Sequence, residues 1–190
     1  KKQRKAFLNE ARILSSLFDI KEVVKVLDYF EERENAYIVM EFVQGISLRQ
    51  YLESRNQPMS FTEAWNFLLP VMEALEKVHQ NKLIHRDISP DNFIIKEDGS
   101  IKLLDFGSAR EYAEEKTMTV LVKKGYAPPE QYSRKGKQGP WTDIYSICAT
   151  LYEMITGVIP QPAMERLKAD KLYLPSSYGC DITPLQEKIL

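Results

Sequence analysis

One polar stretch near the middle of the chain constrains its fold more than any other feature. Residues 85–92 read H-R-D-I-S-P-D-N, and the apolar run F-I-I follows at residues 93–95. Turn-forming residues at 97–99 (E-D-G) lead into the strand-like run I-K-L-L at 101–104. The tripeptide D-F-G at 105–107 comes next. This spacing predicts two short strands joined by a tight turn, directly after a polar loop.

Such a hairpin would bring three oxygen-bearing side chains to one edge of the structure. Asp105 would return to the side of Asn92, and Asp87 precedes Asn92 in the same loop. Oxygen ligands of this kind suit a hard cation such as magnesium and the phosphates that it carries. A lone Asp or Asn in a loop is usually a turn former or a cap. The combination of loop, hairpin and D-F-G favours a catalytic site over that simpler reading.

The pattern H-R-D-x-x-x-x-N, then a hairpin, then D-F-G resembles the catalytic and metal-binding loops of protein kinases. The resemblance implies an α+β, protein-kinase-like fold with a partial small β lobe and a mostly helical large lobe. Residues 1–43 would form the C-terminal part of the small lobe, from its helix C through the last strands to the hinge. Residues 44–190 would form the large lobe, incomplete at its C-terminal end. The implied cofactors are ATP and Mg2+.

The resemblance assigns roles to the polar loop and to the D-F-G segment. Asp87 would accept the proton of the substrate hydroxyl or orient that hydroxyl for attack, and such help is worth roughly 10²–10⁴-fold in rate. Asn92 and Asp105 would hold magnesium. Four residues match an apolar stack that links the two lobes of a kinase: Leu14, Val26, His85 and Phe106.

A nucleotide slot is expected where the small lobe meets the large one. Residues 37–43 resemble the last strand of a kinase small lobe as it enters the hinge. Adenine needs one backbone carbonyl and one backbone amide, which the resemblance places at Glu41 and Val43. Met40 falls at the position that limits the depth of the slot, and it is also compatible with an ordinary buried strand methionine. Two residues match the large-lobe side of the adenine sandwich: Leu48 and Ile94.

Residues 3–18 read as a helix, because apolar residues recur there at helical spacing. Glu10 matches the glutamate that pairs with the phosphate-binding lysine of kinases, although alone it would be read as a solvent-facing carboxylate. That lysine and the loop G-x-G-x-x-G do not occur in the sequence, so the chain resembles a kinase domain cut at its front. The apolar positions of the expected helix are Phe7, Ala11, Leu14 and Phe18.

Two longer helices are expected in the large lobe. Residues 60–63 (S-F-T-E) form a capping box that opens the first of them, and Pro70 inside this helix should kink it or shift its hydrogen bonds. Residues 141–157 are apolar on most faces, which is typical of a buried helix. Asp143 resembles the aspartate that fixes the catalytic loop through backbone amides; helix capping by Thr142, or a dipole role for Asp143, stays open. The buried stripe of the first helix is predicted at Phe61, Trp65, Leu68, Leu69, Met72 and Leu75.

The sequence departs from the kinase pattern at two positions. Serine/threonine kinases usually carry a lysine two residues after the catalytic aspartate, and here Ser89 stands there. They usually carry a threonine where this chain has Lys123. The hydroxyl and the ammonium have therefore exchanged places. We hypothesise that Lys123 supplies positive charge beside Asp87, the alternative being a solvent-exposed Lys123.

Residues 105–130 form the activation segment by the same resemblance. Thr117 and Thr119 lie in its middle, and Arg86 is the kind of residue that binds a phosphorylated side chain there. An unmodified loop is the alternative. Glu130 usually pairs with an arginine far downstream, which this chain does not reach, so we expect Glu130 to lack a partner.

The net charge and the cysteine content limit which classes of partner and which compartment are expected. The formal net charge is -1, from 26 basic and 27 acidic residues, which gives no reason to expect a nucleic acid or a membrane surface. No apolar run reaches the roughly 18 residues of a membrane span. Two cysteines make no disulfide framework, which favours a reducing, cytoplasmic location. A protein substrate is implied, while self-association for autophosphorylation and a membrane anchor elsewhere in the parent protein stay open.

The reading is an ATP-dependent protein serine/threonine kinase, of which this chain is a fragment. Ser89 and Pro90 look like the serine/threonine type, and residues 127–132 (A-P-P-E-Q-Y) look like bacterial, Hanks-type members. The rival from another class is a catalytically silent kinase-like binding module. Retention of Asp87, Asn92 and Asp105 argues against it. A small-molecule phosphotransferase is disfavoured by Arg86 and by the P-E pair at 129–130.

Overall fold

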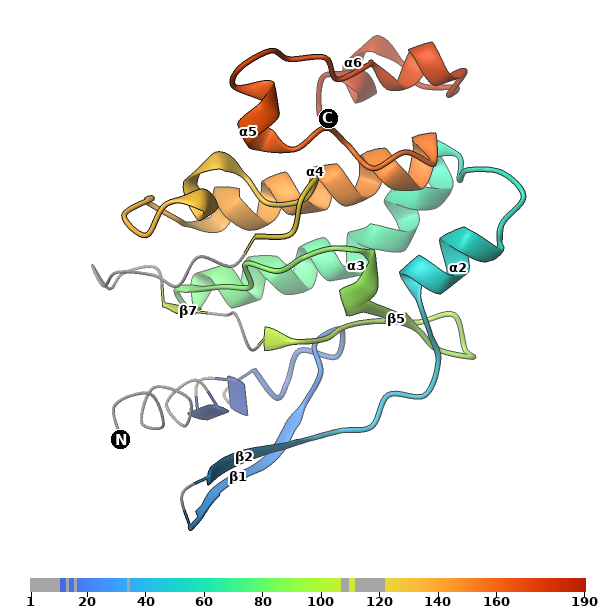
Figure 1. The fold of residues 1–190 in the computed structure, drawn as a ribbon. Helices are drawn as coiled ribbons and strands as arrows, with labels where there is room; N and C mark the ends of the chain where they lie inside the picture. The colour runs from blue at the N-terminus through green and yellow to red at the C-terminus, as the bar shows by residue number, and fades with distance from the viewer. Residues whose placement is uncertain (1–10, 13, 16, 34, 107–109, 112–121) are drawn as a thin grey trace.

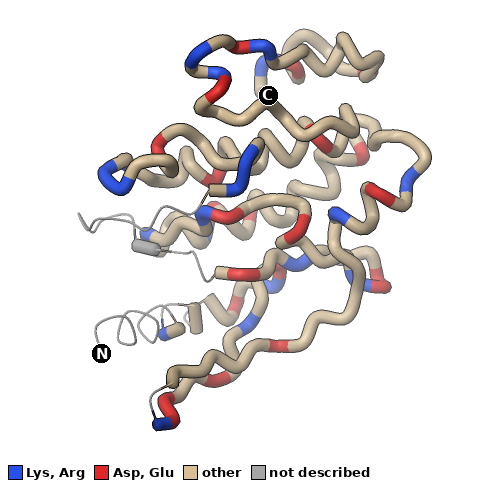
Figure 2. The backbone as a smooth tube through the Cα atoms, viewed as in Figure 1, with Lys and Arg blue, Asp and Glu red and all other residues tan. Residues whose placement is uncertain are grey.

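The computed structural model of the chain describes residues 11–106, 110–111 and 122–190, apart from positions 13, 16 and 34. Its elements are stacked from a β-hairpin, through a small sheet, to two long helices and a helical C-terminal segment (Figure 1). Basic and acidic residues are scattered along the backbone in this view, with both signs in most parts of the chain (Figure 2). The mixed helices and small sheets confirm the predicted α+β class.

The first hairpin is an exposed two-stranded ribbon. Strands β1 (Val26–Glu32) and β2 (Asn35–Met40) pair antiparallel. The stack of Phe30 on Tyr37, with ring centroids 5.3 Å apart, supports the pairing. The apolar residues Val23 and Val24 come before β1 and are not part of it, because they pair with Leu103 of the middle sheet.

The middle sheet contains the hairpin predicted after the polar loop. Strand β5 (Phe93–Ile95) pairs antiparallel with β6 (Ile101–Leu103), and β3 (Ile46–Ser47) pairs with the other edge of β5. The turn between β5 and β6 is closed by Asp98, whose carboxylate accepts the Ser100 backbone N–H at 2.9 Å. The predicted hairpin is therefore confirmed, and it sets the register of β5 against β6 directly after the polar loop.

A second small pairing and a short helix border the polar loop. Strand β4 (Leu83–Ile84) leads into the loop and pairs with β7 (Arg110–Glu111). Helix η1 (Pro90–Asn92) leads out of it into β5. The loop is thus held at both ends by regular backbone hydrogen bonds, which restricts the positions that its side chains can take.

Capping residues set the starts of the helices that surround the site. Helix α2 (Leu48–Ser54) begins at Ser47, which forms a reciprocal capping box with Gln50. Helix α3 (Phe61–Gln80) begins at Ser60, whose hydroxyl accepts the Glu63 N–H at 3.2 Å. Only half of the predicted capping box forms, because the Glu63 side chain bonds Arg55 instead.

The buried face of α3 differs in part from the predicted stripe. Leu69 is exposed, and Trp65 and Met72 are half-buried. Small residues occupy part of the buried face, since they let α4 approach closely. Pro70 lies inside the helix without ending it. The buried residues of α3 are Phe61, Ala64, Leu68, Val71, Ala74, Leu75 and Val78.

Helix α4 (Pro140–Thr156) packs on α3, and most of its residues are buried. Its N-cap is Gly139, so neither Thr142 nor Asp143 is the cap. Trp141 and Ile144 are more than half exposed, which corrects the expectation of burial on all sides. The remaining short helices are η3 (Pro129–Tyr132), α5 (Ala163–Arg166), η4 (Pro175–Tyr178) and α6 (Pro184–Glu187).

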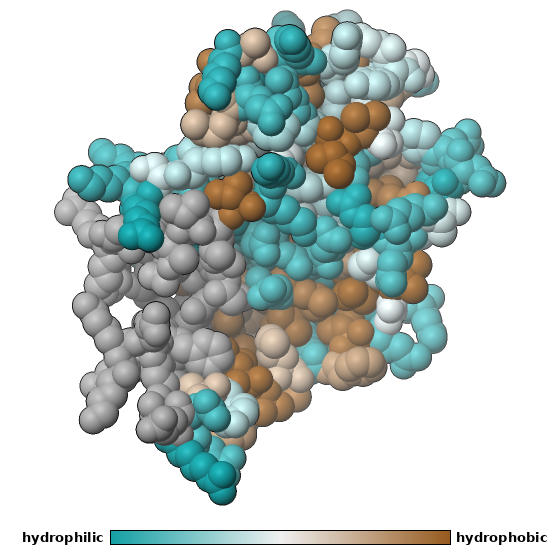
Figure 3. All heavy atoms as spheres, in the orientation of Figure 1, coloured by the Kyte–Doolittle hydropathy of each residue, from teal (hydrophilic) through white to brown (hydrophobic). Residues whose placement is uncertain are grey.

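One hydrophobic core joins the N-terminal segment to the helices. Ala11 and Leu14 are buried as predicted, but Phe18 is 54% exposed and Leu17 takes the buried position. Phe7 lies outside the described residues. On the face viewed in Figure 3, hydrophobic surface gathers between β5 and the β1–β2 hairpin. No helix in the described part of the chain has the length and hydrophobicity that crossing a bilayer requires.

Candidate active site

The backbone of the polar loop is held by one buried carboxylate. Asp143 is fully buried on α4, and its two oxygens accept the backbone N–H groups of His85 and Arg86, each at 2.8 Å. The expected contact between this aspartate and the loop amides is confirmed. His79 Nε2 also lies 2.8 Å from the same carboxylate, a partner that the sequence did not indicate. Three contacts on one buried group fix the loop relative to α3 and α4.

The His85 side chain is a neutral structural group. Burial lowers its pKa, in spite of the nearby acidic residues, so the ring is uncharged near neutral pH. Its Nε2 donates to the Leu104 carbonyl at 2.8 Å, and its ring packs edge-on against Phe106 with centroids 4.4 Å apart. Leu14 and Val26 are buried in the hydrophobic core as well. The contact expected between His85 and Phe106 is therefore present.

The three oxygen-bearing residues lie at one edge, as the hairpin predicted. The Asn92 Nδ2 atom donates to the Asp87 carbonyl at 2.6 Å and to its Oδ2 at 3.1 Å. The Leu104 N–H donates to the Asn92 carbonyl at 2.7 Å, so Asp105 directly follows a residue that is bonded to Asn92. Because the Asn92 nitrogen faces Asp87, its Oδ1 is the atom left for a cation.

The side-chain oxygens of Asn92 and Asp105 fit a magnesium ion that takes most of its ligands from a nucleotide. Within the described part of the chain, no three His, Cys, Asp or Glu side chains form a metal-binding group. Asn92 and Asp105 supply at most two protein ligands, and Asp105 is exposed. Magnesium commonly uses one or two such ligands and takes the rest from phosphates and water.

Two residues of the site have left-handed backbone conformations that non-glycine residues rarely adopt. The φ angles are 73° at Arg86 and 56° at Asp105. The Arg86 side chain is buried, and its Nε donates to Gln138 Oε1 at 2.7 Å. Its carbonyl accepts Gln131 Nε2 at 2.7 Å. The predicted partners of Arg86, Thr117 and Thr119, lie outside the described residues, so phosphate binding by Arg86 stays a prediction.

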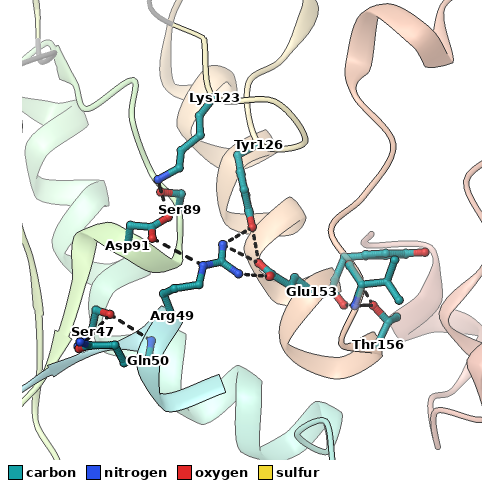
Figure 4. Close-up of polar contacts among 11 residues, drawn as sticks. Ser47, Arg49, Gln50, Ser89, Asp91, Lys123, Tyr126, Glu153 and Thr156 are labelled. Atoms are coloured by element: carbon teal, nitrogen blue, oxygen red, sulfur yellow. Dashed lines mark hydrogen bonds and ion pairs between the residues drawn. The ribbon is translucent and has the colours of Figure 1, made fainter. Parts of the chain in front are cut away.

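The two exchanged residues are in direct contact (Figure 4). The Lys123 Nζ atom donates to Ser89 Oγ at 2.8 Å, and Ser89 is fully buried. The ammonium also forms an ion pair with Asp91. An unpaired, purely solvated Lys123 is therefore excluded. The Lys123 ammonium therefore lies beside the polar loop, at Ser89, which follows Asp87 by two residues in the sequence.

An arginine that the sequence analysis missed lies next to this pair. Arg49 forms an ion pair with Glu153, donates to the Tyr126 hydroxyl at 2.7 Å, and lies 3.6 Å from Asp91 Oδ1 (Figure 4). Burial raises the pKa of Tyr126, and its bond to Glu153 raises it further. No motif links these positions, because they are far apart in the sequence and meet only in the folded chain.

The charges around Asp91 keep its carboxylate ionised. Burial alone would raise the pKa of Asp91, but the bond from Lys123 and the charges of Lys123 and Arg49 outweigh it and lower the pKa. For Arg49, burial would lower the pKa, and the bonds to Glu153 and Tyr126 raise it instead. Both groups are thus charged across the physiological range.

The segment expected to be the hinge is tied to the middle sheet. The Glu41 carboxylate binds Lys102 of β6 and accepts the Lys25 N–H at 2.9 Å. The Glu41 N–H donates to the Lys25 carbonyl at 2.9 Å, so only its own carbonyl remains for a ligand. Met40 is 46% exposed, which rules out an ordinary buried strand methionine. Val43 is half-buried against the core.

The two residues expected on the large-lobe side of the slot differ in exposure. Ile94 is half-buried, and it pairs with Ser47 in the middle sheet. Leu48 follows Ser47 and has no exposed surface. Because the Leu48 side chain is fully covered, its expected place on the large-lobe side of the slot stays a prediction. Glu10 lies outside the described residues.

The carboxylate of Glu130 has a partner, contrary to expectation. The Thr142 hydroxyl donates to Glu130 Oε1 at 2.8 Å. The same hydroxyl accepts the Gly139 N–H at 3.2 Å, at the start of α4. The end of the activation segment is thus connected to α4 by a local hydrogen bond, which the expected pairing with a distant arginine could not reveal.

Comparison with known proteins shows the family of the chain. A family model described as the protein kinase domain matches residues 1–178. The chain is 39% identical over 157 residues to the serine/threonine-protein kinase PrkC of Bacillus subtilis (strain 168), covering 81% of this chain and 24% of that protein. It is 35% identical over 174 residues to the serine/threonine-protein kinase PknL of Mycobacterium tuberculosis (strain ATCC 25618 / H37Rv), covering 86% and 43%.

A solved structure shows the same arrangement of elements. The PpkA-294 apo form superposes with a TM-score of 0.78 at 31% identity, covering 98% of this chain and 66% of that one. The chain belongs to the protein kinase family. Its serine/threonine-kinase relatives place it in the bacterial, Hanks-type branch of that family. It spans less than half the length of these curated relatives.

Proposed function

We propose that the protein transfers the γ-phosphoryl group of ATP to a serine or threonine hydroxyl of a protein substrate. The observation that carries this proposal is the convergence of Asp87, Asn92 and Asp105 at one edge of a loop fixed by Asp143. The relatives that carry the name serine/threonine-protein kinase support it. We propose further that residues 1–43 and 44–190 act as parts of two lobes, with the nucleotide between them.

The roles of the three site residues follow from their chemistry. The half-buried Asp87 orients the substrate hydroxyl and accepts its proton as the new O–P bond forms and the bond to the ADP oxygen breaks. Asn92 Oδ1 and the Asp105 carboxylate hold Mg2+. The magnesium-bound nucleotide, when present, supplies the phosphoryl group and charge neutralisation for its oxygens.

Lys123 provides positive charge on the substrate side of the loop. Its ammonium donates to the buried Ser89 hydroxyl at 2.8 Å and therefore contacts the polar loop that also contains Asp87. A fixed cation at this place stabilises negative charge that develops on the transferred group. Ser89 has the complementary role, since it orients the ammonium without neutralising it.

The nucleotide base binds between the hinge and β5. The Glu41 carbonyl and the Val43 N–H bind adenine, while the exposed Met40 side chain limits the depth of the slot. Ile94 contacts the base, and Leu48 supports it from behind. Glu10 pairs with a phosphate-binding lysine that this sequence does not contain.

Regulation and location follow from the same proposal. Arg86 binds a phosphate on Thr117 or Thr119, and autophosphorylation between two copies of the protein provides it. The kinase domain works in the cytoplasm, where ATP is available, and the chain offers no feature for nucleic acid.

Autophosphorylation of the full-length protein tests the proposal. Incorporation of labelled phosphate from Mg-ATP is expected in the wild type and is reduced about 10²-fold or more in Asp87→Asn. The exposed Asp181, changed to Asn, is the matched control and keeps wild-type activity. Equal incorporation by Asp87→Asn and wild type would support the silent binding module instead.

A second substitution tests the role of Lys123. Lys123→Met is expected to reduce kcat about 10²-fold, because a preorganised donor to developing charge is lost. The neighbouring, exposed Lys124, changed to Met, controls for loss of a lysine in the same segment. An unaffected kcat in Lys123→Met would show that this charge takes no part in the transfer.

A further inference from the structure

The guanidinium of Arg49 joins three segments that are distant in the sequence (Figure 4). From the first turn of α2 it contacts Asp91 at the end of the polar loop, Tyr126 near the end of the activation segment, and Glu153 on α4. The Glu153 side chain is only 6% exposed. Since a buried carboxylate needs a compensating charge, Glu153 holds Arg49 in place.

Asp91 connects this cluster to the exchanged pair. One carboxylate oxygen, Oδ2, binds the Lys123 ammonium, and the other, Oδ1, lies 3.6 Å from Arg49 Nε. A continuous series of opposite charges thus runs from Glu153 through Arg49 and Asp91 to Lys123. Each member is fixed by the next, and the series ends at the Ser89 hydroxyl.

A lysine needs such support to act at a defined place. Its four-carbon side chain has many rotamers, and the Lys123 side chain is 36% exposed, so one hydroxyl alone would restrain it weakly. Asp91 is itself 43% exposed and would turn toward solvent without Arg49 on its other side. The planar guanidinium supplies that restraint because it is held by Glu153 and Tyr126 at the same time.

We propose that Arg49 is a positioning residue: through Asp91 it holds the Lys123 ammonium at Ser89, beside Asp87. This inference rests on the proposed role of Lys123 in phosphoryl transfer. Arg49 acts through its neighbours and contacts no reacting group. Through Tyr126 and Glu153 the same guanidinium ties the placement of that charge to the segment around Tyr126 and to α4.

A double-mutant cycle in the full-length protein tests this indirect action. Arg49→Met is expected to reduce kcat about tenfold, with KM for ATP changed less than about twofold, since the nucleotide contacts are elsewhere. In the Lys123→Met background the same substitution is expected to reduce kcat by less than about twofold, because the group that Arg49 positions is already gone.

Two further variants guard against a misfolded Arg49→Met. Asp91→Asn removes the link to Lys123 while leaving the Arg49, Tyr126 and Glu153 cluster intact, and it is expected to show the same dependence on Lys123. Arg55→Met is the matched control. Arg55 also binds one tyrosine hydroxyl and one glutamate, Tyr51 at 2.9 Å and Glu63 at 2.8 Å, but away from the polar loop, and its loss should leave kcat unchanged.

The outcomes separate this inference from the function on which it rests. If Arg49→Met and Asp91→Asn reduce kcat by the same factor with and without Lys123, their role is structural and the inference is wrong. An unchanged kcat in both variants would also overturn it. If Lys123→Met alone has no effect, the proposed role of Lys123 fails first, whatever the Arg49 variant shows.

Discussion

At the scale of single residues, motif positions predicted contacts well and isolated residues poorly. Ser89 and Lys123 were paired from two departures in known motifs, and their side chains meet at 2.8 Å. Asp143 was likewise assigned to the loop amides, which it binds. Arg49 and His79 were missed, because their partners are brought to them only by the packing of α2, α3 and α4. Local sequence carries no information on such long-range pairs.

The buried carboxylate of Asp143 gives a stability prediction. Asp143→Asn keeps the shape of the side chain but replaces an accepting oxygen by an NH2 group, so a buried loop N–H loses its acceptor. Unfolding in urea should show a loss of about 1–3 kcal/mol in the free energy of unfolding.

The comparison for this variant is Asp170→Asn. Asp170 is an exposed carboxylate that forms an ion pair with Arg166 at 3.0 Å. Its substitution should change the free energy of unfolding by less than about 0.5 kcal/mol. If the two variants were equally stable, the three contacts on Asp143 would not be holding the loop.

Glu41 gives a prediction of pH dependence. Burial raises its pKa, but the bond to Lys102, the Lys25 backbone N–H and both lysine charges outweigh burial, so the folded pKa is lowered. A lowered folded pKa adds stability above the unfolded pKa of about 4.3, and that stability is lost as the pH falls through the folded value. Glu41→Gln should therefore be less stable than wild type at pH 7, by up to about 1 kcal/mol.

The difference between Glu41→Gln and wild type should shrink as the pH is lowered toward 3. Urea unfolding at a series of pH values measures it. Glu73→Gln, on the exposed side of α3, is the control and should show no such trend. A difference that stays constant from pH 7 to 3 would contradict the assignment of this ion pair.

At the scale of elements, capping residues mark several starts and ends. Ser47 begins α2, Thr183 begins α6, and Gly157 ends α4 with a left-handed φ of 73°. Other boundaries depend on tertiary contacts, which local sequence does not reveal. Strand β1 begins only at Val26, because the residues before it bind the middle sheet.

The approach of the hinge to β5 gives an element-scale prediction. Gly45 has a φ of 158°, and a Cβ there would lie 2.1 Å from the Ile95 carbonyl oxygen. Gly45→Ala must therefore push the hinge away from β5. We expect weaker ATP binding, measured by calorimetry on the full-length protein, together with a lower free energy of unfolding, by about 2 kcal/mol or more.

Gly99→Ala, in the β5–β6 turn, is the control that distinguishes the effect of steric overlap from the effect of backbone conformation. Its φ is 78°, but a Cβ added there would have no other atom within 4 Å. Gly99→Ala should lose only about 1–2 kcal/mol, from the left-handed backbone, and should bind ATP normally. Normal ATP binding by Gly45→Ala would show that the hinge does not depend on this close approach.

At the scale of the whole molecule, the class of fold was predictable and the packing was not. The site motif alone was sufficient for the protein kinase family, which the match over residues 1–178 confirms. The layers of the fold depend on which faces of α3 and α4 meet. The exposed Trp141 and Ile144 show that the hydrophobicity of the residues alone did not predict these faces. An apolar groove of about 610 Å³ between the two helices includes Ile144 and Cys148.

The alkylation rates of the two cysteines can be used to test whether this packing is intact. Both are free and half-buried, and burial raises the pKa of each thiol. The raised pKa values of the two thiols add to the free energy of unfolding. This contribution is complete below the unfolded pKa of about 8.5 and is lost as the pH rises through the folded pKa. At pH 7.5, alkylation of Cys148 and Cys180 should be at least about tenfold slower in the folded than in the unfolded protein.

Peptide mapping after timed exposure to iodoacetamide, with and without guanidinium chloride, measures both sites. The folded rate should increase when the pH is raised above 9, as thiolate forms. Equal rates in folded and unfolded protein would mean that the face formed by α3, α4 and the C-terminal segment is open.

The left-handed backbone conformations of Arg86 and Asp105 lower the stability of the fold at two residues with proposed functional roles. Each is unfavourable for a residue with a side chain, by on the order of 1 kcal/mol, and a glycine would relieve it. At Arg86, glycine would also remove a buried guanidinium and its bond to Gln138 Oε1, so the net result there would be a loss of stability. At the exposed Asp105, glycine would relieve the backbone but remove the carboxylate that we propose holds Mg2+. A selection for heat resistance alone would therefore favour Asp105→Gly and would lose the proposed phosphoryl transfer with it.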